Sequence, residues 1–315
     1  MIKYVPLVIS LFVLGCAPAE ESAPGADTNA APVTARVVEE LDTASLNRDA
    51  GDMPTVDIGM YLIETDSERY NERMPQDEIH RRYELAREVF AGVGVNLNLM
   101  WIRLVEVNTD DLEIESNVML GSPAGDIDDL YEKSRQQRSA LSPEAEAMFE
   151  AIIEPDPAND RTVYLVGMED VIMNWYEQQD SGDWEIRSDP TNALSFPSYT
   201  LEDRIPRRLR GVITVQNIFK SQKIIAHELG HKLINVSHEY RDINPAHEVD
   251  AEGGLMVYGE GTEIPAGEEG RWHHERLMLS PYLYRMVDGE KVYNRDYQES
   301  GHYADPIYQG LTVRN

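Results

Sequence analysis

The stretch that decides the fold is residues 211–238, GVITVQNIFKSQKIIAHELGHKLINVSH. It begins with a run rich in β-branched residues at 211–216, which indicates a strand. After a short link, apolar residues recur at helical spacing: Ile224, Ile225, Leu229 and Leu233. The stretch therefore predicts a strand followed by a helix, inside a fold that combines both kinds of element.

Two histidines, His227 and His231, stand four residues apart on this expected helix. Four residues make about one turn, so both imidazoles leave the same face. Two neutral imidazoles on one face can hold Zn²⁺. Glu228, next to the first histidine, can take a proton from a zinc-bound water, whose pKa falls to about 7. The pattern H-E-x-x-H in this context predicts a catalytic zinc site.

A catalytic zinc takes three protein ligands and keeps one position open. The nearest candidate is His238, seven residues after His231, which a continuous helix would place about two turns away. Asn235 can end the helix, because asparagine tolerates the left-handed conformation better than most residues. The chain can then turn back toward the metal. Glu248 and Glu252 are the alternative third ligands, since carboxylates also bind zinc.

The run HELGHKLINVSH at residues 227–238 resembles the motif of the metzincin zinc peptidases, H-E-x-x-H-x-x-G-x-x-H. It departs from that motif twice, because one extra residue follows His231 and an asparagine stands at the family's glycine. One extra helical residue rotates the exit of the chain by about 100°. Downstream, residues 254–258 (GLMVY) resemble the turn that places a methionine beneath the metal in this family.

The resemblance implies a metzincin-like zincin domain of the α/β (α+β) class. Such a domain has a mixed twisted sheet, an active-site helix and a smaller C-terminal subdomain. The resemblance implies that His227, His231 and His238 bind zinc and that Met256 is the methionine of the turn. Tyr258 would be a fifth ligand or stabilise the oxyanion. Ordinary core roles for Met256 and Tyr258 are the alternatives.

The body of the chain opens with strand, helix and strand. Thr55–Glu64 alternates apolar and polar residues, which predicts a half-buried strand. Helical spacing follows from Pro75, with Gly92 as the C-terminal glycine, and residues 95–105 alternate again. This order predicts a parallel pair joined by a crossover helix.

Weaker patterns predict the remaining elements. Short helices are expected at residues 126–133 and 143–153, strands at 162–166 and 193–196, a late helix at 272–284 and packed extended chain from Asp288. Pro197 suits an edge position. We therefore expect residues 193–196 to form the edge along which an extended substrate would pair.

The N-terminus has the form of an export signal. Residues 1–15 place Lys3 before an apolar run that is too short to span a bilayer as a helix. The sequence Val13-Leu14-Gly15-Cys16 resembles a bacterial lipobox. The resemblance implies that Cys16 is lipidated and anchors an exported protein in the cell envelope. Ala17 then favours the outer membrane; a plain signal peptide is the alternative.

Four regions follow from these patterns. Residues 1–15 form the signal peptide, and residues 16–53, rich in Ala, Pro, Ser, Thr and acids, form the anchor and a flexible tether. Residues 54–239 are expected to form the N-terminal zincin subdomain with the active-site helix. Residues 240–315 are expected to form the C-terminal subdomain with the methionine turn and a closing helix.

Composition limits the partners. Lys plus Arg is 28 and Asp plus Glu is 57, a net charge of −29, which disfavours binding to nucleic acid and to anionic lipid headgroups. The single cysteine, Cys16, excludes an intramolecular disulfide. We expect a zinc-dependent endopeptidase that acts on protein or peptide substrates and reaches the membrane only through its lipid anchor. The alternatives are a surface-anchored zinc-binding lipoprotein without proteolytic activity and a metal-free structural lipoprotein.

Overall fold

The computed structural model describes residues 32–67, 71, 75–110, 112, 114–116, 139–155, 161–168, 171–178, 181–182, 184–191, 193–195, 209–216, 222–236, 254–256, 263–264 and 271–295. Contacts divide the chain into Met1–Pro32 and a compact unit, Val33–Asn315. The second unit holds every described helix and strand.

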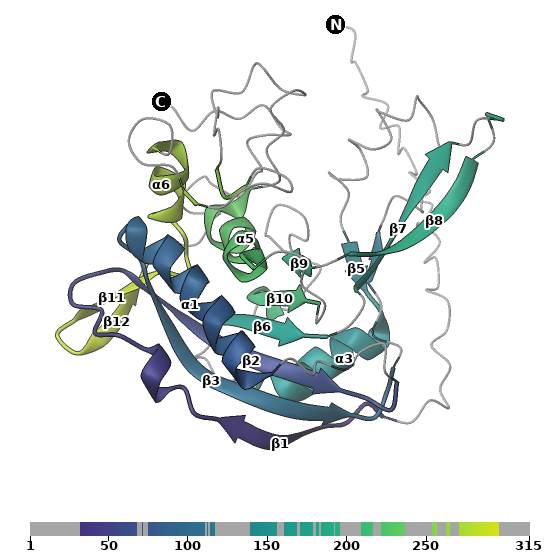
Figure 1. Cartoon of the computed structure of the whole chain (residues 1–315), viewed down its shortest axis with the longest axis horizontal. Helices are drawn as coiled ribbons and strands as arrows, with labels where there is room; N and C mark the ends of the chain where they lie inside the picture. The colour runs from purple at the N-terminus through teal and green to yellow at the C-terminus, as the bar shows by residue number, and fades with distance from the viewer. Residues whose placement is uncertain are drawn as a thin grey trace, which may run out of the picture. The chain divides into compact units, whose positions relative to one another are not determined.

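A mixed sheet forms the centre of this unit, with the strand order β1-β3-β2-β6-β10-β9 (Figure 1). The inner strands run parallel: β2 (Thr55–Glu64), β3 (Asn96–Val107), β6 (Val163–Gly167) and β10 (Val212–Val215). At the two ends of this path, β1 (Ala35–Leu41) and β9 (Ala193–Ser195) run antiparallel to their neighbours. The mixed sheet with few helices agrees with the α+β class that the sequence predicts.

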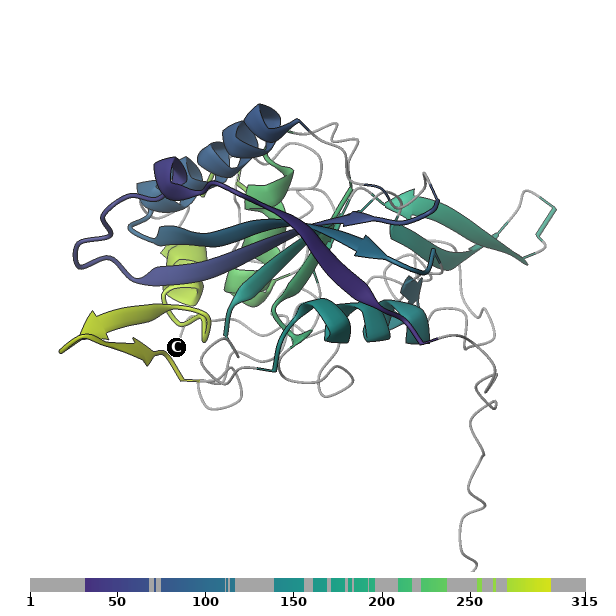
Figure 2. The same ribbon diagram turned by 90° about the horizontal axis from the view of Figure 1, so that it is seen from below.

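Helices cover both faces of the sheet (Figure 2). Helix α1 (Gln76–Gly92) joins β2 to β3 and packs one apolar face into the larger core cluster. Helix α3 (Pro143–Ile152) packs on the opposite face in a second cluster. Strand β2 contributes to both clusters and is buried along almost its whole length, so the expectation of a half-buried strand is wrong. Parallel strands between two layers of helices are buried on both sides.

The strand–helix–strand unit at the start of the body is confirmed, because β2 and β3 pair in parallel with α1 between them. The expected C-terminal glycine is displaced by two residues. Gly92 is the last residue of α1, and the left-handed conformation falls on Gly94, with φ 76°. The helix at 143–153 and the strands at 162–166, 193–196 and 211–216 are confirmed within a residue or two as α3, β6, β9 and β10. The expected helix at 126–133 lies outside the described residues.

Strand β1 lies inside the region expected to be a tether, so that expectation is wrong from Ala35 on. Composition misses this strand because its side chains are mostly exposed and charged, as suits an edge strand. What holds it is backbone pairing with β3, from Ala35 opposite Val107 to Leu41 opposite Ile102. The 3₁₀ turn η1 (Ala44–Leu46) follows and buries Leu46.

The C-terminal part is also tied to the main sheet. Helix α6 (Arg271–Leu277) is shorter than the helix expected at 272–284, because the chain turns after it and Tyr284 begins a strand. Strands β11 (Tyr284–Val287) and β12 (Glu290–Tyr293) form a hairpin around Asp288 and Gly289, whose φ angles are 53° and 86°. Of the tail expected to be packed extended chain from Asp288, the described part forms the turn and the mostly exposed second strand of this hairpin, and the rest lies outside the described residues.

The hairpin meets β2 through a buried carboxylate. Tyr284 pairs with Thr55 in the sheet. Asp57, 1% exposed, accepts hydrogen bonds from the Asn98 side chain at 2.8 Å and from the Tyr284 hydroxyl at 2.9 Å, and it forms an ion pair with Lys291. The segment that includes the hairpin thus belongs to the same compact unit as the sheet.

Two further antiparallel strand pairs were not expected from the sequence. They pair β4 (Ile114–Ser116) with β5 (Ser139–Leu141), and β7 (Val171–Gln178) with β8 (Trp184–Thr191). Among the described helices, none is long and apolar enough to cross a membrane.

Candidate metal centre

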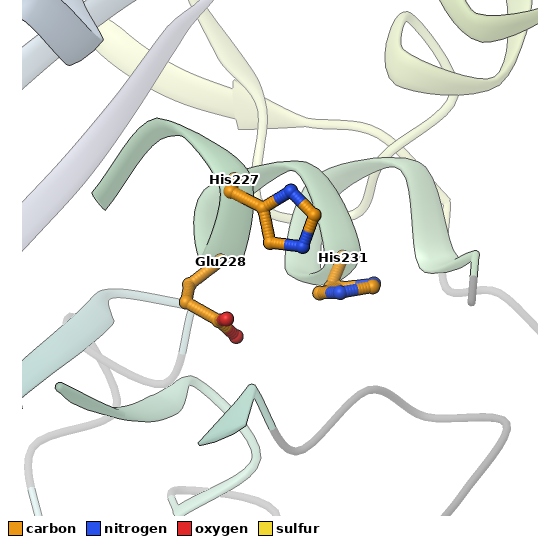
Figure 3. Close-up of side chains that lie close together, drawn as sticks. All are labelled: His227, Glu228 and His231. Carbon is orange, nitrogen blue, oxygen red and sulfur yellow. The ribbon is translucent and has the colours of Figure 1, made fainter. Parts of the chain in front are cut away.

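The site stands on the helix that follows β10. Helix α5 (Ile224–Gly230) continues directly into a π-helical turn, η6 (His231–Asn235). Ile225, Leu229 and Leu233 are buried in the larger core cluster together with α1. This apolar face fixes the rotation of the helix. His227, Glu228 and His231 therefore point to one side of it (Figure 3).

These three side chains form a group that could hold a metal ion. One ligand atom from each of His227, Glu228 and His231 lies within 4.8 Å of the others. The two imidazole rings are 4.7 Å apart between centroids, at an interplanar angle of 87°. Within the described parts of the chain, this is the one such group of histidines and acids found. The sequence prediction that the two imidazoles share one face is confirmed, and Glu228 lies beside them.

Each imidazole is oriented by a backbone carbonyl. His227 Nδ1 lies 2.6 Å from the Leu255 oxygen, and His231 Nδ1 lies 2.6 Å from the Val236 oxygen. Because a carbonyl only accepts, each Nδ1 carries the hydrogen, and Nε2 of a neutral ring is left as the metal-binding nitrogen. Burial lowers the pKa of His227, which favours the neutral ring. Metal-binding histidines are commonly held in this way, so these residues could hold a metal ion.

Met256 packs against the same helix. Its side chain is fully buried, and a methyl group added to Gly230 would overlap its sulfur. Glycine at position 230 therefore permits the close approach. The preceding residue, Leu255, supplies the carbonyl that orients His227. The segment expected as the methionine turn thus meets the helix at both residues.

Glu228 is buried at 5% exposure beside the edge strand. Burial raises the pKa of its carboxyl to about 8, while a hydrogen bond from the Ser195 backbone N–H and the positive charge of Lys232 act to lower it. Lys232 is itself 1% exposed, and its Nζ donates to the Arg210 carbonyl at 2.6 Å. Glu228 thus lies beside β9 and is influenced by Lys232, whose own pKa burial lowers well below its ordinary value.

The π-helical turn η6 bears on the one extra residue that follows His231 in the sequence. A π turn closes its hydrogen bonds from i to i+5 and so contains one residue more than an α turn. It takes up the extra residue after His231, and the rotation of about 100° expected for a regular helix does not apply. Asn235 then ends the helix with φ 55°, as the sequence predicts. The next residue, Val236, already points its carbonyl back at His231.

Several residues of the predicted site lie outside the described part of the chain: Cys16, His238, Glu248, Glu252 and Tyr258. Of the residues that sequence reasoning missed, Lys232 carried a signal, because it stands four residues after Glu228 on the same helical face. The carbonyls of Leu255 and Val236 carried none, since any residue type offers a carbonyl.

No protein-family model matches the chain, and a search of curated proteins finds no relative. Fold and site define an α+β protein with a histidine–glutamate group able to hold a metal ion.

Proposed function

We propose that the protein is a zinc-dependent endopeptidase with a metzincin-like site. The observation that carries the proposal is the pair of imidazoles, His227 and His231, whose Nδ1 atoms are both engaged by carbonyls while Glu228 lies beside them. Zinc bound there would act as a Lewis acid on the scissile carbonyl and lower the pKa of a bound water. The proton transfers are assigned to side chains of this protein.

Glu228 is the proposed general base. It takes a proton from the attacking water and returns it to the leaving amine. A base works best when its pKa is near the operating pH. Burial raises the pKa of Glu228 to about 8, against the Ser195 N–H and Lys232, which act to lower it. The hydrogen bond from Ser195 also fixes the orientation of the carboxylate.

His238 is the proposed third ligand. The π-helical turn supports this proposal, because it places the left-handed residue, Asn235, at the point where the motif requires the chain to reverse. Three residues then lead from Asn235 to His238, as in the motif. Glu248 and Glu252 remain the alternative ligands. Tyr258, two residues after Met256, is the proposed fifth ligand or oxyanion stabiliser.

The substrate is proposed to bind along β9. This strand lies at one end of the strand path, antiparallel to β10, and the Ser195 backbone reaches Glu228. An extended peptide that pairs with such an edge gains backbone hydrogen bonds whatever its sequence. The scissile bond would then pass the general base. Lipidation of Cys16 and anchoring in the outer membrane complete the proposal.

The test uses the full chain. We expect about one zinc per chain, cleavage of an unfolded protein, and loss of cleavage when a chelator removes the metal. Glu228→Gln should keep the zinc and lose about 10²- to 10⁴-fold in rate, the usual contribution of a general base. His227→Ala should lose the metal itself. Cleavage that resists the chelator, or full activity in Glu228→Gln, would contradict the proposal.

The alternative is a zinc-binding surface lipoprotein without proteolytic activity. The deep burial of Glu228 favours it, because a carboxylate closed off from solvent meets a substrate water less readily. Stoichiometric zinc with no hydrolysis across a broad peptide library would support this alternative. A chain purified without chelator that holds no metal would favour the third hypothesis, a structural lipoprotein.

A further inference from the structure

The π-helical turn η6, which ends the helix that carries His227 and His231, is capped by a side chain from helix α6. The last carbonyls of a helix have no partner within it and need a donor from elsewhere. Arg276, on α6, supplies two: its Nε donates to the Ile234 carbonyl and its Nη2 to the Asn235 carbonyl, each at 2.9 Å. Arg276 is 3% exposed, so its charge is placed at the negative end of the helix dipole away from bulk water.

These two carbonyls immediately precede the one that orients His231. Asn235 adopts φ 55°, a left-handed conformation that asparagine tolerates better than most residues with a side chain. The next residue, Val236, accepts the hydrogen of His231 Nδ1 at 2.6 Å. A guanidinium that binds the carbonyls of Ile234 and Asn235 therefore also fixes the Asn235–Val236 peptide, which directly precedes the Val236 carbonyl.

A second link joins the same two parts of the chain. Lys232 Nζ and the Tyr282 hydroxyl both donate to the Arg210 carbonyl, at 2.6 and 2.9 Å. Arg276 thus contacts the helix end directly, and Tyr282 reaches it only through the Arg210 carbonyl that it shares with Lys232. The planar fork of arginine suits two neighbouring carbonyls, whereas the single ammonium of lysine does not reproduce that geometry.

We propose that Arg276 is a positioning residue of the metal site. It acts through the reversal at Asn235 and the Val236 carbonyl, sets the orientation of His231, and directs the chain that leads to His238. The inference rests on the proposed function, since it assumes that His231 binds zinc. It adds a residue on a separate helix, α6, that the motif does not contain.

The test compares Arg276→Met and Arg276→Lys with the full wild-type chain. Zinc affinity is measured by competition with a chelating dye, on protein whose folding is verified by circular dichroism. Loss of a group that orients a ligand typically costs 10- to 100-fold in metal affinity, and we expect a loss of about this size for Arg276→Met. Arg276→Lys should lose less, because one donor and the charge remain. The cobalt-substituted variants should also show altered visible absorption bands.

Arg271→Met is the matched control. Arg271 lies on the same helix and forms an exposed ion pair with Glu275 at 3.0 Å, so its loss should leave zinc affinity unchanged. A merely structural role for Arg276 would lower the thermal stability of the metal-free protein without changing zinc affinity in the folded variants, and that result would overturn the inference alone. If Arg276→Met does not fold, the affinity of Arg276→Lys decides. A wild-type chain that binds no zinc would instead overturn the proposed function.

Discussion

Met256 lies so close to Gly230 that a methyl group on the glycine would overlap the methionine sulfur. We expect Gly230→Ala to be destabilising, although alanine is the better helix former by about 1 kcal/mol. Overpacking of a buried contact costs about 1–3 kcal/mol and should also displace Leu255, whose carbonyl orients His227. Thermal unfolding of the metal-free protein and zinc affinity should therefore both fall.

Gly92→Ala is the control for that substitution. Gly92 ends α1, and no atom lies within 4 Å of a methyl group placed there. This change should leave zinc affinity intact and raise stability by up to about 1 kcal/mol. Equal stabilisation by both substitutions would show that Met256 moves aside freely.

The third metal ligand can be identified by three single substitutions. We expect His238→Ala to lower zinc affinity by more than the 10- to 100-fold typical of groups that only orient a ligand. Glu248→Gln and Glu252→Gln, which keep side-chain size, should leave affinity unchanged. The reverse pattern in a dye-competition titration would assign the ligand to a glutamate.

The left-handed residue at the end of the metal helix should tolerate glycine but not valine. Asn235→Gly removes the steric cost of φ 55° and should keep zinc binding. Asn235→Val adds a β-branched side chain to a conformation that already costs about 1–2 kcal/mol, and both stability and zinc affinity should fall. Asp288→Val, at φ 53° in the exposed hairpin turn, is the control and should lower stability alone. Unchanged zinc affinity in Asn235→Val would separate the reversal from the site.

Stability should fall in strongly alkaline solution because of Tyr293. Burial first, then the negative charge of Asp57, raise its pKa to about 12, against about 10 for an unfolded tyrosine. The folded state therefore keeps its proton after the unfolded state has lost it, so this contribution is present below pH 10 and is lost between about pH 10 and 12. Tyr293→Phe should flatten this part of a plot of unfolding free energy against pH. An unchanged slope would assign the loss to other groups, of which Tyr284, whose pKa is also raised, is the first to test by Tyr284→Phe.

The sequence predicts those parts of the fold in which local pattern and long-range packing agree. The apolar run at Thr55–Glu64 and the helical spacing before Gly92 gave the bounds of β2 and α1 nearly to the residue, although β2 is buried on both faces and α1 on one. Strand β1 was missed because backbone pairing with β3, which leaves no mark on side-chain pattern, is what holds it. The Asp-Gly pair at 288–289 is typical of a tight hairpin turn, and the turn lies at these residues.

In the candidate site too, some features could be predicted from local sequence pattern and others could not. His227 and His231 are one helical turn apart, so the convergence of their imidazoles was predictable, and Glu228 was expected only to flank them. The π-helical turn was not, because nothing in KLIN distinguishes a π turn from an α turn before tertiary contacts are known. The Arg276 cap joins residues more than forty positions apart, and no local pattern reports such a contact.

The buried carboxylate of Asp57 links the first strand of the parallel sheet to the last described hairpin. Its tyrosine partner lies 227 residues later in the chain and its lysine partner 234 residues later. A chain that ends before Tyr284 would keep the hydrogen bond from Asn98 to Asp57 but lose the tyrosine and lysine partners. Because removing the partner of a buried charge is destabilising, we expect such a chain to be less stable than the full one.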